Sequence, residues 1–304
     1  MCRRIIAVLM ALAITMGSTG CGKKKEIPAT QYPISAVEHQ VGIISFIDLG
    51  MGESTLLEAG GVTILIDTGS SGTYDTLKEF LKAKGLRAVD ALIITNPQDD
   101  YCGAAAQFVE DYRVQQVLVP KWSADIINKY QHYIDFNTAV IKKGIPVRNT
   151  SYGFQGTVGQ VKMITLGPQS DFYSDIGDYS QIIRFSLGGV TYLHMSACGT
   201  VAQQELISGR FVCQSDIMRT PRLSVKKGTI SEFVGVVDPK VVIAPGSGKG
   251  FKSARDENLN EYTNRNIEVF EMVDHGTVTM ATDGRDFGFT SDYYQNQDAG
   301  EKIR

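Results

Sequence analysis

Short apolar runs separated by glycine-rich turns are the feature that most constrains the fold of this chain. Residues 41–50 (VGIISFIDLG), 54–60 (STLLEAG) and 62–69 (VTILIDTG) have the length and composition of β-strands that end in turns. Residues 73–85 (TYDTLKEFLKAKG) come next, and their apolar residues recur three and four positions apart, which is the spacing of a helix. The pattern predicts strands that are packed against helices.

The alternation continues through the rest of the chain. The expected strands are residues 89–95, 114–120, 160–167, 180–189, 190–197 and 240–246, and the expected helices are residues 104–112, 201–208 and 259–267. Residues 268–274 and 277–284 are expected to form a closing hairpin around His275 and Gly276. Strand–helix–strand units with short connections predict a layered α/β fold of two similar halves.

The predicted domain is single and covers residues 41–288. Residues 22–40 contain three lysines, two prolines and little apolar periodicity, so we interpret them as a polar tether. Residues 289–304 are predicted to be a polar tail. The net charge is −3, so no basic surface points to nucleic acid as a partner of the whole chain.

The first 21 residues have the layout of an export signal. Arg3 and Arg4 precede an apolar stretch over residues 5–16, and small residues lead to Cys21. The apolar stretch is shorter than the roughly 20 residues that a spanning helix needs. The sequence Ser-Thr-Gly-Cys resembles a bacterial lipoprotein processing site, although Ser18 stands where leucine is usual. This resemblance implies that Cys21 is acylated and anchors the protein to the outer face of the cytoplasmic membrane. The alternative is an ordinary cleaved signal with an incidental cysteine.

Cysteine content limits the disulfides. Cys2 leaves with the signal and Cys21 is expected to carry lipid, so Cys102, Cys198 and Cys213 remain in the exported protein. Three cysteines cannot all pair within one chain.

Several motifs together identify a family resemblance. Residues 48–54 (DLGMGES) match a D-x-G-x-G-D-S opening with Glu53 in place of aspartate, and residues 66–69 (IDTG) match the segment that follows. In this order they resemble the metallo-β-lactamase-fold hydrolases, and in particular the metallo-hydrolase domain of the bacterial competence DNA-uptake protein and its free-standing relatives. The resemblance implies a four-layer αββα sandwich with its active site at one edge.

In that family two metal ions, usually zinc, are held by histidines and aspartates and activate a water molecule. Residues 95–104 (TNPQDDYCGA) occupy the place of the family's T-H-P-H-A-D-H-I-G-G loop. Asn96 and Gln98 stand where two histidines belong, Asp100 keeps the aspartate beside Asp99, and Tyr101 replaces the last histidine. Amides are feeble zinc ligands beside imidazole, so this loop is degenerate.

The other ligand positions are also altered. Aligning YLHMSACG with F-L-x-T-G-D-A puts Ala197 where the bridging aspartate belongs. Aligning MRTPRLSVKKG with K-V-x-H-H-G-S puts Arg222 and Leu223 over two histidines. None of the four histidines, His39, His132, His194 and His275, falls on a ligand position, and strand alternation is expected to aim His194 away from the site. The resemblance therefore implies no metal, or at most one weakly bound divalent cation or zinc.

Two hypotheses concern what fills the altered site. Arg222 either forms an ion pair with Asp100 or points to solvent. Cys102 and Cys198 flank the site, and they either form a disulfide or a thiol cluster or are buried as small hydrophobic residues.

Residues 244–253 (APGSGKGFKS) fail the spacing of a phosphate-binding loop and are expected to be a flexible loop on the rim of the site. Lys249 and Lys252 are candidate ligand contacts there. The basic residues Arg219, Arg222, Lys226 and Lys227 either form a solvated face or attract an anion such as a nucleic-acid backbone.

Three functions follow from these observations. The first is a cell-surface lipoprotein with a metallo-β-lactamase-like fold and no working metal centre, which binds a ligand or an envelope protein. The second is a metal-dependent hydrolase of phosphodiesterase or nuclease type, with one cation on Asp99 and Asp100 or a site rebuilt from Cys102, Cys198 and His194. The third is a structural part of an envelope complex.

Overall fold

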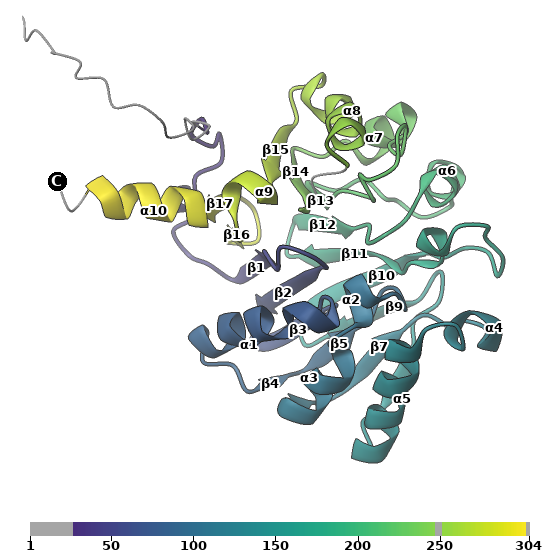
Figure 1. Cartoon of the computed structure of the whole chain (residues 1–304). Helices are drawn as coiled ribbons and strands as arrows, with labels where there is room; N and C mark the ends of the chain where they lie inside the picture. The colour runs from purple at the N-terminus through teal and green to yellow at the C-terminus, as the bar shows by residue number, and fades with distance from the viewer. Residues whose placement is uncertain (1–26, 247–250, 302–304) are drawn as a thin grey trace, which may run out of the picture.

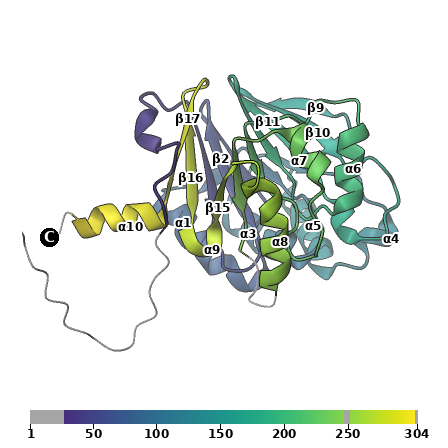
Figure 2. The same ribbon diagram turned by 90° about the horizontal axis from the view of Figure 1, so that it is seen from above.

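The structure is a computed structural model, and it describes residues 27–246 and 251–301. Two mixed β-sheets pack face to face, and helices cover the outer face of each (Figures 1 and 2). This is the four-layer αββα arrangement predicted from the sequence. Among the described residues, no helix combines the length and the apolar character needed to cross a membrane.

The first sheet has eight strands in the order β17-β16-β1-β2-β3-β5-β7-β8. Their bounds are β1 Gly42–Ile47, β2 Ser54–Ala59, β3 Val62–Ile66, β5 Ala91–Ile93, β7 Val117–Val119, β8 Val147–Asn149, β16 Val278–Thr282 and β17 Phe287–Ser291. Strands β3, β5, β7 and β8 run parallel, so the ends of β3, β5 and β7 meet at one edge. The short strands β4 (Ala88–Val89) and β6 (Arg113–Val114) form a separate pair.

The second sheet has seven strands in the order β15-β14-β13-β12-β11-β10-β9. Their bounds are β9 Gln155–Val158, β10 Val161–Gly167, β11 Ile182–Leu187, β12 Val190–His194, β13 Ile217–Arg219, β14 Val241–Ala244 and β15 Glu268–Glu271. Strands β12 to β15 run parallel and also send their carboxyl ends to one edge.

Helices cover both outer faces. The bounds are α1 Tyr74–Ala83, α2 Asp99–Cys102, α3 Ala105–Asp111, α4 Ala124–Ile127, α5 Gln131–Lys143, α6 Thr200–Ser208, α7 Ser231–Val237, α8 Lys252–Thr263, α9 Met272–His275 and α10 Asp292–Glu301. Three short 3-10 turns are η1 Ile34–Ala36, η2 Ser71–Thr73 and η3 Ile176–Tyr179. In Figure 1, α1, α3 and α5 lie on one side of the sheets and α6, α7 and α8 on the other.

Three hydrophobic cores correspond to the three interfaces between layers. One lies between the two sheets and contains Phe46 of β1 and Tyr192 of β12. The second joins the first sheet to α1, α3 and α5, with Phe108 of α3 at its centre. The third joins the second sheet to α6, α7 and α8 and contains Phe233 and Tyr262. Burial of this apolar surface is the main stabilising contribution.

Two expectations near the carboxyl terminus differ from the structure. The hairpin predicted for residues 268–284 is wrong, because β15 pairs with β14 in one sheet whereas β16 pairs with β1 and β17 in the other. The hairpin is instead formed by β16 and β17. The expected domain end at residue 288 falls inside β17, and α10 continues the chain away from the body of the molecule (Figure 2).

The expected tether is also partly structured. Phe289 of β17 donates from its backbone N–H to the Tyr32 carbonyl at 2.7 Å, and Pro33 forms a bridge with the same residue. Tyr32 and Pro33 therefore lie along β17, the edge strand of the first sheet. The signal segment, Cys21 and the first residues of the tether lie outside the described residues.

Candidate functional site at the edge of the two sheets

The loops that carry the family motifs converge at the carboxyl edge of both sheets. Glu53 donates its backbone N–H to the Asp100 carbonyl at 2.8 Å, and Thr68 donates to the Tyr101 carbonyl at 2.9 Å. A Cβ on Gly52 would lie 2.6 Å from the Ser70 nitrogen, so these loops approach too closely for any residue but glycine. The sequence alignment thus predicted correctly which segments meet.

Asn96 takes the place of a family histidine and is fully buried. Its Nδ2 donates to the Ile176 carbonyl at 3.1 Å and to the Ser180 Oγ at 3.0 Å, and its Oδ1 accepts from the backbone N–H of Gln98 at 3.0 Å. Both ends of the amide are therefore used within the protein. The Gln98 side chain is only partly buried at the start of α2.

The two carboxylates of the loop lie at the surface side of the site. Asp99 accepts from the Ser71 backbone N–H at 3.2 Å, and its Oδ1 lies 3.3 Å from the Nε2 of His132 on α5. Asp100 is exposed, although partial desolvation and the adjacent Asp99 raise its pKa.

The hypothesis of an Asp100–Arg222 ion pair is wrong. Arg222 binds Asp175 instead, with Nη2 2.5 Å from Oδ2 and Nη1 3.3 Å from Oδ1. Asp175 comes just before η3, and this loop brings its carboxylate to the guanidinium. The bidentate contact with Arg222 lowers the pKa of Asp175.

Arg219, which we expected in a basic surface cluster, is buried with 3% of its surface exposed. Its Nη1 donates to the carbonyls of Ser196 and Thr220, both at 2.9 Å, and its Nη2 forms an ion pair with Glu53. Burial lowers the pKa of Arg219 to about 9, so the guanidinium is still protonated at neutral pH. The Tyr101 hydroxyl donates at 3.4 Å to the Glu53 Oε1, the same oxygen that pairs with Arg219.

Ala197 and Leu223 complete the altered positions. Both are buried, with 1% and 3% of their surface exposed, and neither side chain carries a donor atom for a metal.

A second cluster of buried polar residues, around Asp67, was not predicted from the sequence. Asp67 is completely buried and accepts from Thr95 through both oxygens, at 2.7 Å from the backbone N–H and 2.5 Å from the hydroxyl. The Thr95 hydroxyl also lies 2.6 Å from the hydroxyl of Ser196. Burial raises the pKa of Asp67, and the hydrogen bonds and His194 oppose that rise.

His194 belongs to this group, contrary to the expectation that it points elsewhere. Its Nδ1 lies 2.8 Å from the Tyr192 hydroxyl, and its Nε2 lies 3.8 Å from the Asp67 Oδ2. Asp67 and Ser196 both have a left-handed backbone, with φ of 60° and 54°. Left-handed aspartate and serine are uncommon, and residues in such conformations cluster at functional sites.

The three cysteines described by the structure are free and buried, so the hypothesis of a disulfide between Cys102 and Cys198 is wrong. Cys102 belongs to the core beneath the first sheet and Cys198 to the core beneath the second. Burial raises the pKa of both thiols well above the usual value, which makes them inert.

The lysines proposed as ligand contacts have different positions. Lys252 is exposed at the start of α8, where its Nζ forms an ion pair with Asp256 at 2.6 Å. Lys226 and Lys227 are exposed in the loop before α7. Lys249 lies outside the described residues.

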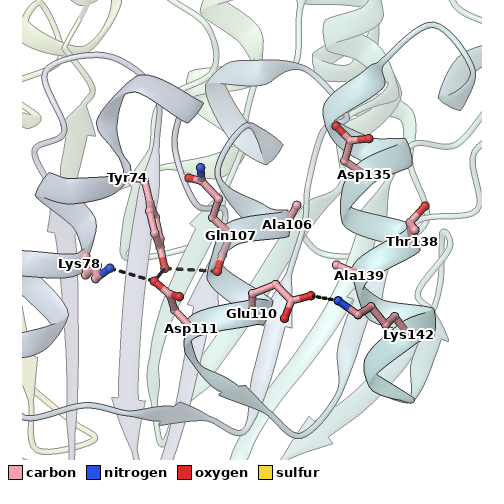
Figure 3. Close-up of a pocket in the computed structure, with 10 residues that line it drawn as sticks. All are labelled: Tyr74, Lys78, Ala106, Gln107, Glu110, Asp111, Asp135, Thr138, Ala139 and Lys142. Carbon is pink, nitrogen blue, oxygen red and sulfur yellow. Dashed lines mark hydrogen bonds and ion pairs between the residues drawn. The ribbon is translucent and has the colours of Figure 1, made fainter.

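The cavity at the convergence of the loops is very small. It has a volume of about 20 Å³ and is lined by Glu53, Arg219 and the loop that follows β1, which is room for about one water molecule. A larger groove of about 660 Å³ lies on the outer face of the first sheet, between α1, α3 and α5 (Figure 3). Four of its charged residues form two ion pairs, Lys78 with Asp111 and Lys142 with Glu110.

The residues at the site do not fit the two zinc ions of the family. The family's donors are replaced by two amides, a phenol, a guanidinium and two hydrocarbon side chains. Over residues 27–246 and 251–301, no group of three or more histidine, cysteine, aspartate or glutamate side chains is arranged to hold a metal ion. Arg219 and Arg222 at the site are paired with Glu53 and Asp175.

Comparison with known proteins agrees with the fold. Residues 47–175 match the family model described as the metallo-beta-lactamase superfamily. ComE operon protein 3 of Bacillus subtilis (strain 168) is 22% identical over 266 residues, which are 81% of this chain and 33% of that protein. The chain thus spans about a third of the length of this curated relative.

Solved structures of low sequence identity share the architecture. The metallo-beta-lactamase fold protein YhfI from Bacillus subtilis has 13% identity and a TM-score of 0.53, over 75% of this chain and 95% of that one. The metallo hydrolase Igni18 from Ignicoccus hospitalis KIN4/I has 17% identity and a TM-score of 0.52, over 78% and 98%. The diiron β-hydroxylase CmlA from Streptomyces venezuelae has 13% identity and a TM-score of 0.56, over 79% and 54%.

Proposed function

The chain carries a metallo-beta-lactamase superfamily domain related to ComE operon protein 3, and on this premise we propose that it is a non-catalytic member of that fold. In this proposal the protein is a lipoprotein that binds a ligand or an envelope protein at the bacterial cell surface. It uses the family's scaffold without the family's chemistry.

One observation carries the proposal: four of the residues at the metal-ligand positions, Asn96, Ala197, Arg222 and Leu223, are bonded into the protein or have no donor atom. Asn96 is bonded to η3 and Arg222 to Asp175, while Ala197 is a buried methyl group. Removing a buried hydrogen-bonded group costs about 1–3 kcal/mol, so these side chains are not free to turn toward a metal. A dinuclear hydrolase needs the opposite arrangement, with donors directed at an open centre.

The proposed location depends on the amino-terminal signal. Acylation of Cys21 would anchor the domain to the outer face of the cytoplasmic membrane, and an envelope protein or other ligand would be reached from there. A nucleic-acid backbone is a weaker candidate, because Arg219 and Arg222 of the basic cluster are engaged in ion pairs.

Metal analysis of two matched proteins tests the proposal. The wild-type chain and a variant with Asn96→His, Gln98→His, Tyr101→His, Ala197→Asp, Arg222→His and Leu223→His are incubated with zinc or manganese and separated from free metal. We expect far less than one ion per wild-type chain, and zinc uptake by the variant if it keeps the wild-type circular dichroism spectrum. Near-stoichiometric metal in the wild type, together with phosphodiesterase or lactamase activity, would overturn the proposal whatever the variant does.

A metal-dependent hydrolase with a mononuclear site is the second candidate. It is favoured by the position of Asp99 and Asp100 at the surface, with His132 3.3 Å from Asp99. Oxygen ligands of this kind suit a hard cation such as Mg²⁺ or Mn²⁺. Activity that requires such a cation and disappears in Asp100→Asn would support it. The alternative that used Cys102, Cys198 and His194 has no such support, because all three are buried.

A further inference from the structure

We propose that the edge of the domain that carries the altered site faces the membrane and contacts anionic phospholipid. This inference rests on the proposed acylation of Cys21. It adds an orientation and a contact surface, which we call the membrane face and define by Met51, Val225, Phe251 and Val273, with Lys226 and Lys227 beside them.

The chain is fastened to the domain from Ile27 onward. The Ile27 backbone N–H donates to the Tyr293 hydroxyl at 3.2 Å, and the Tyr294 hydroxyl donates to the Pro28 carbonyl at 2.8 Å. Gln31 donates to Glu268 Oε2 at 3.1 Å, and the Tyr32 ring packs on Phe287 with centroids 5.1 Å apart. Ile27, the first described residue, is therefore held on the domain.

Ile27 lies next to the edge that carries the altered site. Together with Val273 of α9 it lines a cavity of about 420 Å³. Val273 also lies on the side of the site, because a Cβ on Gly246 would lie 3.6 Å from the Val273 Cγ1 and 3.6 Å from the Gly50 carbonyl. A continuous path thus leads from Ile27 through Val273 to the loop that holds Met51.

The tether is too short to let the far side of the domain face the membrane. Six residue steps separate Cys21 from Ile27, and at about 3.5 Å each they span roughly 20 Å when fully extended. A domain of this size has a radius of gyration of roughly 18 Å, so its far side is about twice that distance away. With Cys21 at the lipid headgroups, the side of the molecule that holds Ile27 and α9 must be the near side.

The near side carries several exposed apolar side chains. The exposed fractions are 66% for Met51, 49% for Phe251, 48% for Val225 and 45% for Val273. Val225 is held beside α8, because its carbonyl accepts from the Asn258 Nδ2 at 2.8 Å. The start of α8 lies beside α9, because the Arg255 Nη2 is 3.0 Å from the Glu271 Oε2, so these apolar residues come from neighbouring elements of one side of the domain.

The charges beside these residues favour an anionic lipid surface. Lys226 and Lys227 are exposed and have no ion-pair partner among the described residues, and Lys23, Lys24 and Lys25 belong to the tether itself. Acidic residues are also present at this edge: Asp256 is paired with Lys252, Asp99 lies 3.3 Å from His132, and Asp100 is exposed. Asp48 caps the backbone of Gly50 at 2.9 Å, and Asp274 lines the cavity beside Ile27. Lysines near a membrane are attracted by anionic headgroups over about a Debye length.

Photo-crosslinking of the acylated full-length protein on vesicles tests the orientation. The photoreactive amino acid p-benzoylphenylalanine replaces Met51 or Val273 on the membrane face, and Ile141 or Val147 in matched control variants. Ile141 and Val147 are as exposed, at 71% and 48%, but belong to α5 and β8. The vesicles contain phosphatidylglycerol and phosphatidylcholine, and lipid adducts are measured by mass spectrometry.

We expect a several-fold excess of lipid adducts from positions 51 and 273 over positions 141 and 147, and a smaller excess when phosphatidylglycerol is omitted. Equal adducts from all four positions, or none from 51 and 273 on vesicle-bound protein, would overturn the inference. Mass spectrometry of the amino-terminal peptide separates this result from a failure of the proposed anchor. If Cys21 is not acylated and the protein stays off the vesicles, the anchor and the orientation that depends on it are both overturned.

Discussion

Asp67 and His194 come from different sheets, and the Asp67 Oδ2 lies 3.8 Å from the His194 Nε2 in a region closed to solvent. Asp67 follows β3 and His194 ends β12, so this contact joins the two halves of the sandwich below the altered site. Around it, Arg219 and Arg222 bring the positive charge that is matched by Glu53 and Asp175. The site is therefore a set of polar contacts between residues of the same chain, and each of these residues makes a testable contribution to stability.

Replacing Arg219 with methionine keeps much of the side-chain volume and removes the partner of Glu53. A largely buried carboxylate without its partner is expected to lower the free energy of unfolding by about 3–5 kcal/mol. Urea unfolding measures the change, and adding Glu53→Gln should recover part of it. Lys78→Met, which breaks an exposed pair with Asp111, is the control and should leave stability nearly unchanged. Equal effects of the two methionine variants would contradict the importance of the buried pair.

Asn96→Ala removes the amide that bonds to Ile176 and Ser180. The variant is expected to lose about 1–3 kcal/mol of stability, because buried acceptors are left without a donor. Asn96→Asp should lose more, since it also buries a charge. Thermal unfolding followed by circular dichroism gives the comparison, with Asn260→Ala on the exposed side of α8 as the control. If the variants at position 96 have the same thermal midpoint as Asn260→Ala, the Asn96 amide is dispensable for stability.

The pair of Asp175 and Arg222 predicts a small dependence of stability on acid pH. Because Arg222 lowers the pKa of Asp175, the folded protein binds fewer protons at this carboxylate than the unfolded chain does. The stabilisation is full above the unfolded pKa of about 3.9 and is lost as the pH falls through the lower native value. The side chains are partly exposed, so the contribution is about 1 kcal/mol or less. The difference in stability between wild type and Asp175→Asn should shrink from pH 6 to pH 3, and a constant difference would exclude this pair as a contributor.

The buried thiols are expected to resist modification in the folded protein. Burial raises the pKa of Cys102 and Cys198, and both side chains are fully inaccessible. Iodoacetamide should therefore label peptides with Cys102, Cys198 and Cys213 only after denaturation. The same peptide maps, made without reductant, should contain no disulfide between Cys102 and Cys198. Rapid labelling of Cys102 or Cys198 in the native protein would mean that the loops around the altered site open to solvent.

The amino-terminal segment should open without unfolding of the domain. Tyr293→Phe with Tyr294→Phe removes the two hydroxyl contacts to Ile27 and Pro28 and leaves the rings in place. Faster proteolysis within residues 27–33 is expected, with an unchanged thermal midpoint, because local segments open independently of the core. Tyr112→Phe, a partly buried tyrosine on the opposite side of the first sheet, is the control. Unchanged proteolysis would show that the bridge of Pro33 to Phe289 is sufficient.

Much of the architecture was predictable from local pattern. The strands and helices follow alternation and helical spacing, and the motifs at strand ends placed Asn96, Ala197 and Arg222 at one edge of the sandwich. The partner of Arg222 was not predictable, because Asp175 is 47 positions away and reaches it only through the path of η3. The burial of Arg219 was missed because three of its neighbours in the sequence cluster are exposed or partly exposed.

The prediction of a closing hairpin over residues 268–284 was wrong for a related reason. Residues 268–271 and 278–282 both have the composition of strands and are close in sequence, and local pattern does not reveal that the chain changes sheets between them. His194 was assigned by strand alternation to the wrong side. His194 shares the face of β12 with Val190 and Tyr192, which point between the two sheets, and that face leads to Asp67 of the other sheet.

The hydroxyl contact of Thr95 with Ser196 extends the same connection, since Thr95 follows β5 and Ser196 follows β12. Hydrogen bonds between side chains, unlike metal–ligand bonds, are not broken when a chelator removes metal ions from solution. Purification in EDTA would then leave the thermal midpoint of this domain unchanged. The two sheets would stay packed together under conditions in which a fold that depends on a metal loses the metal and unfolds.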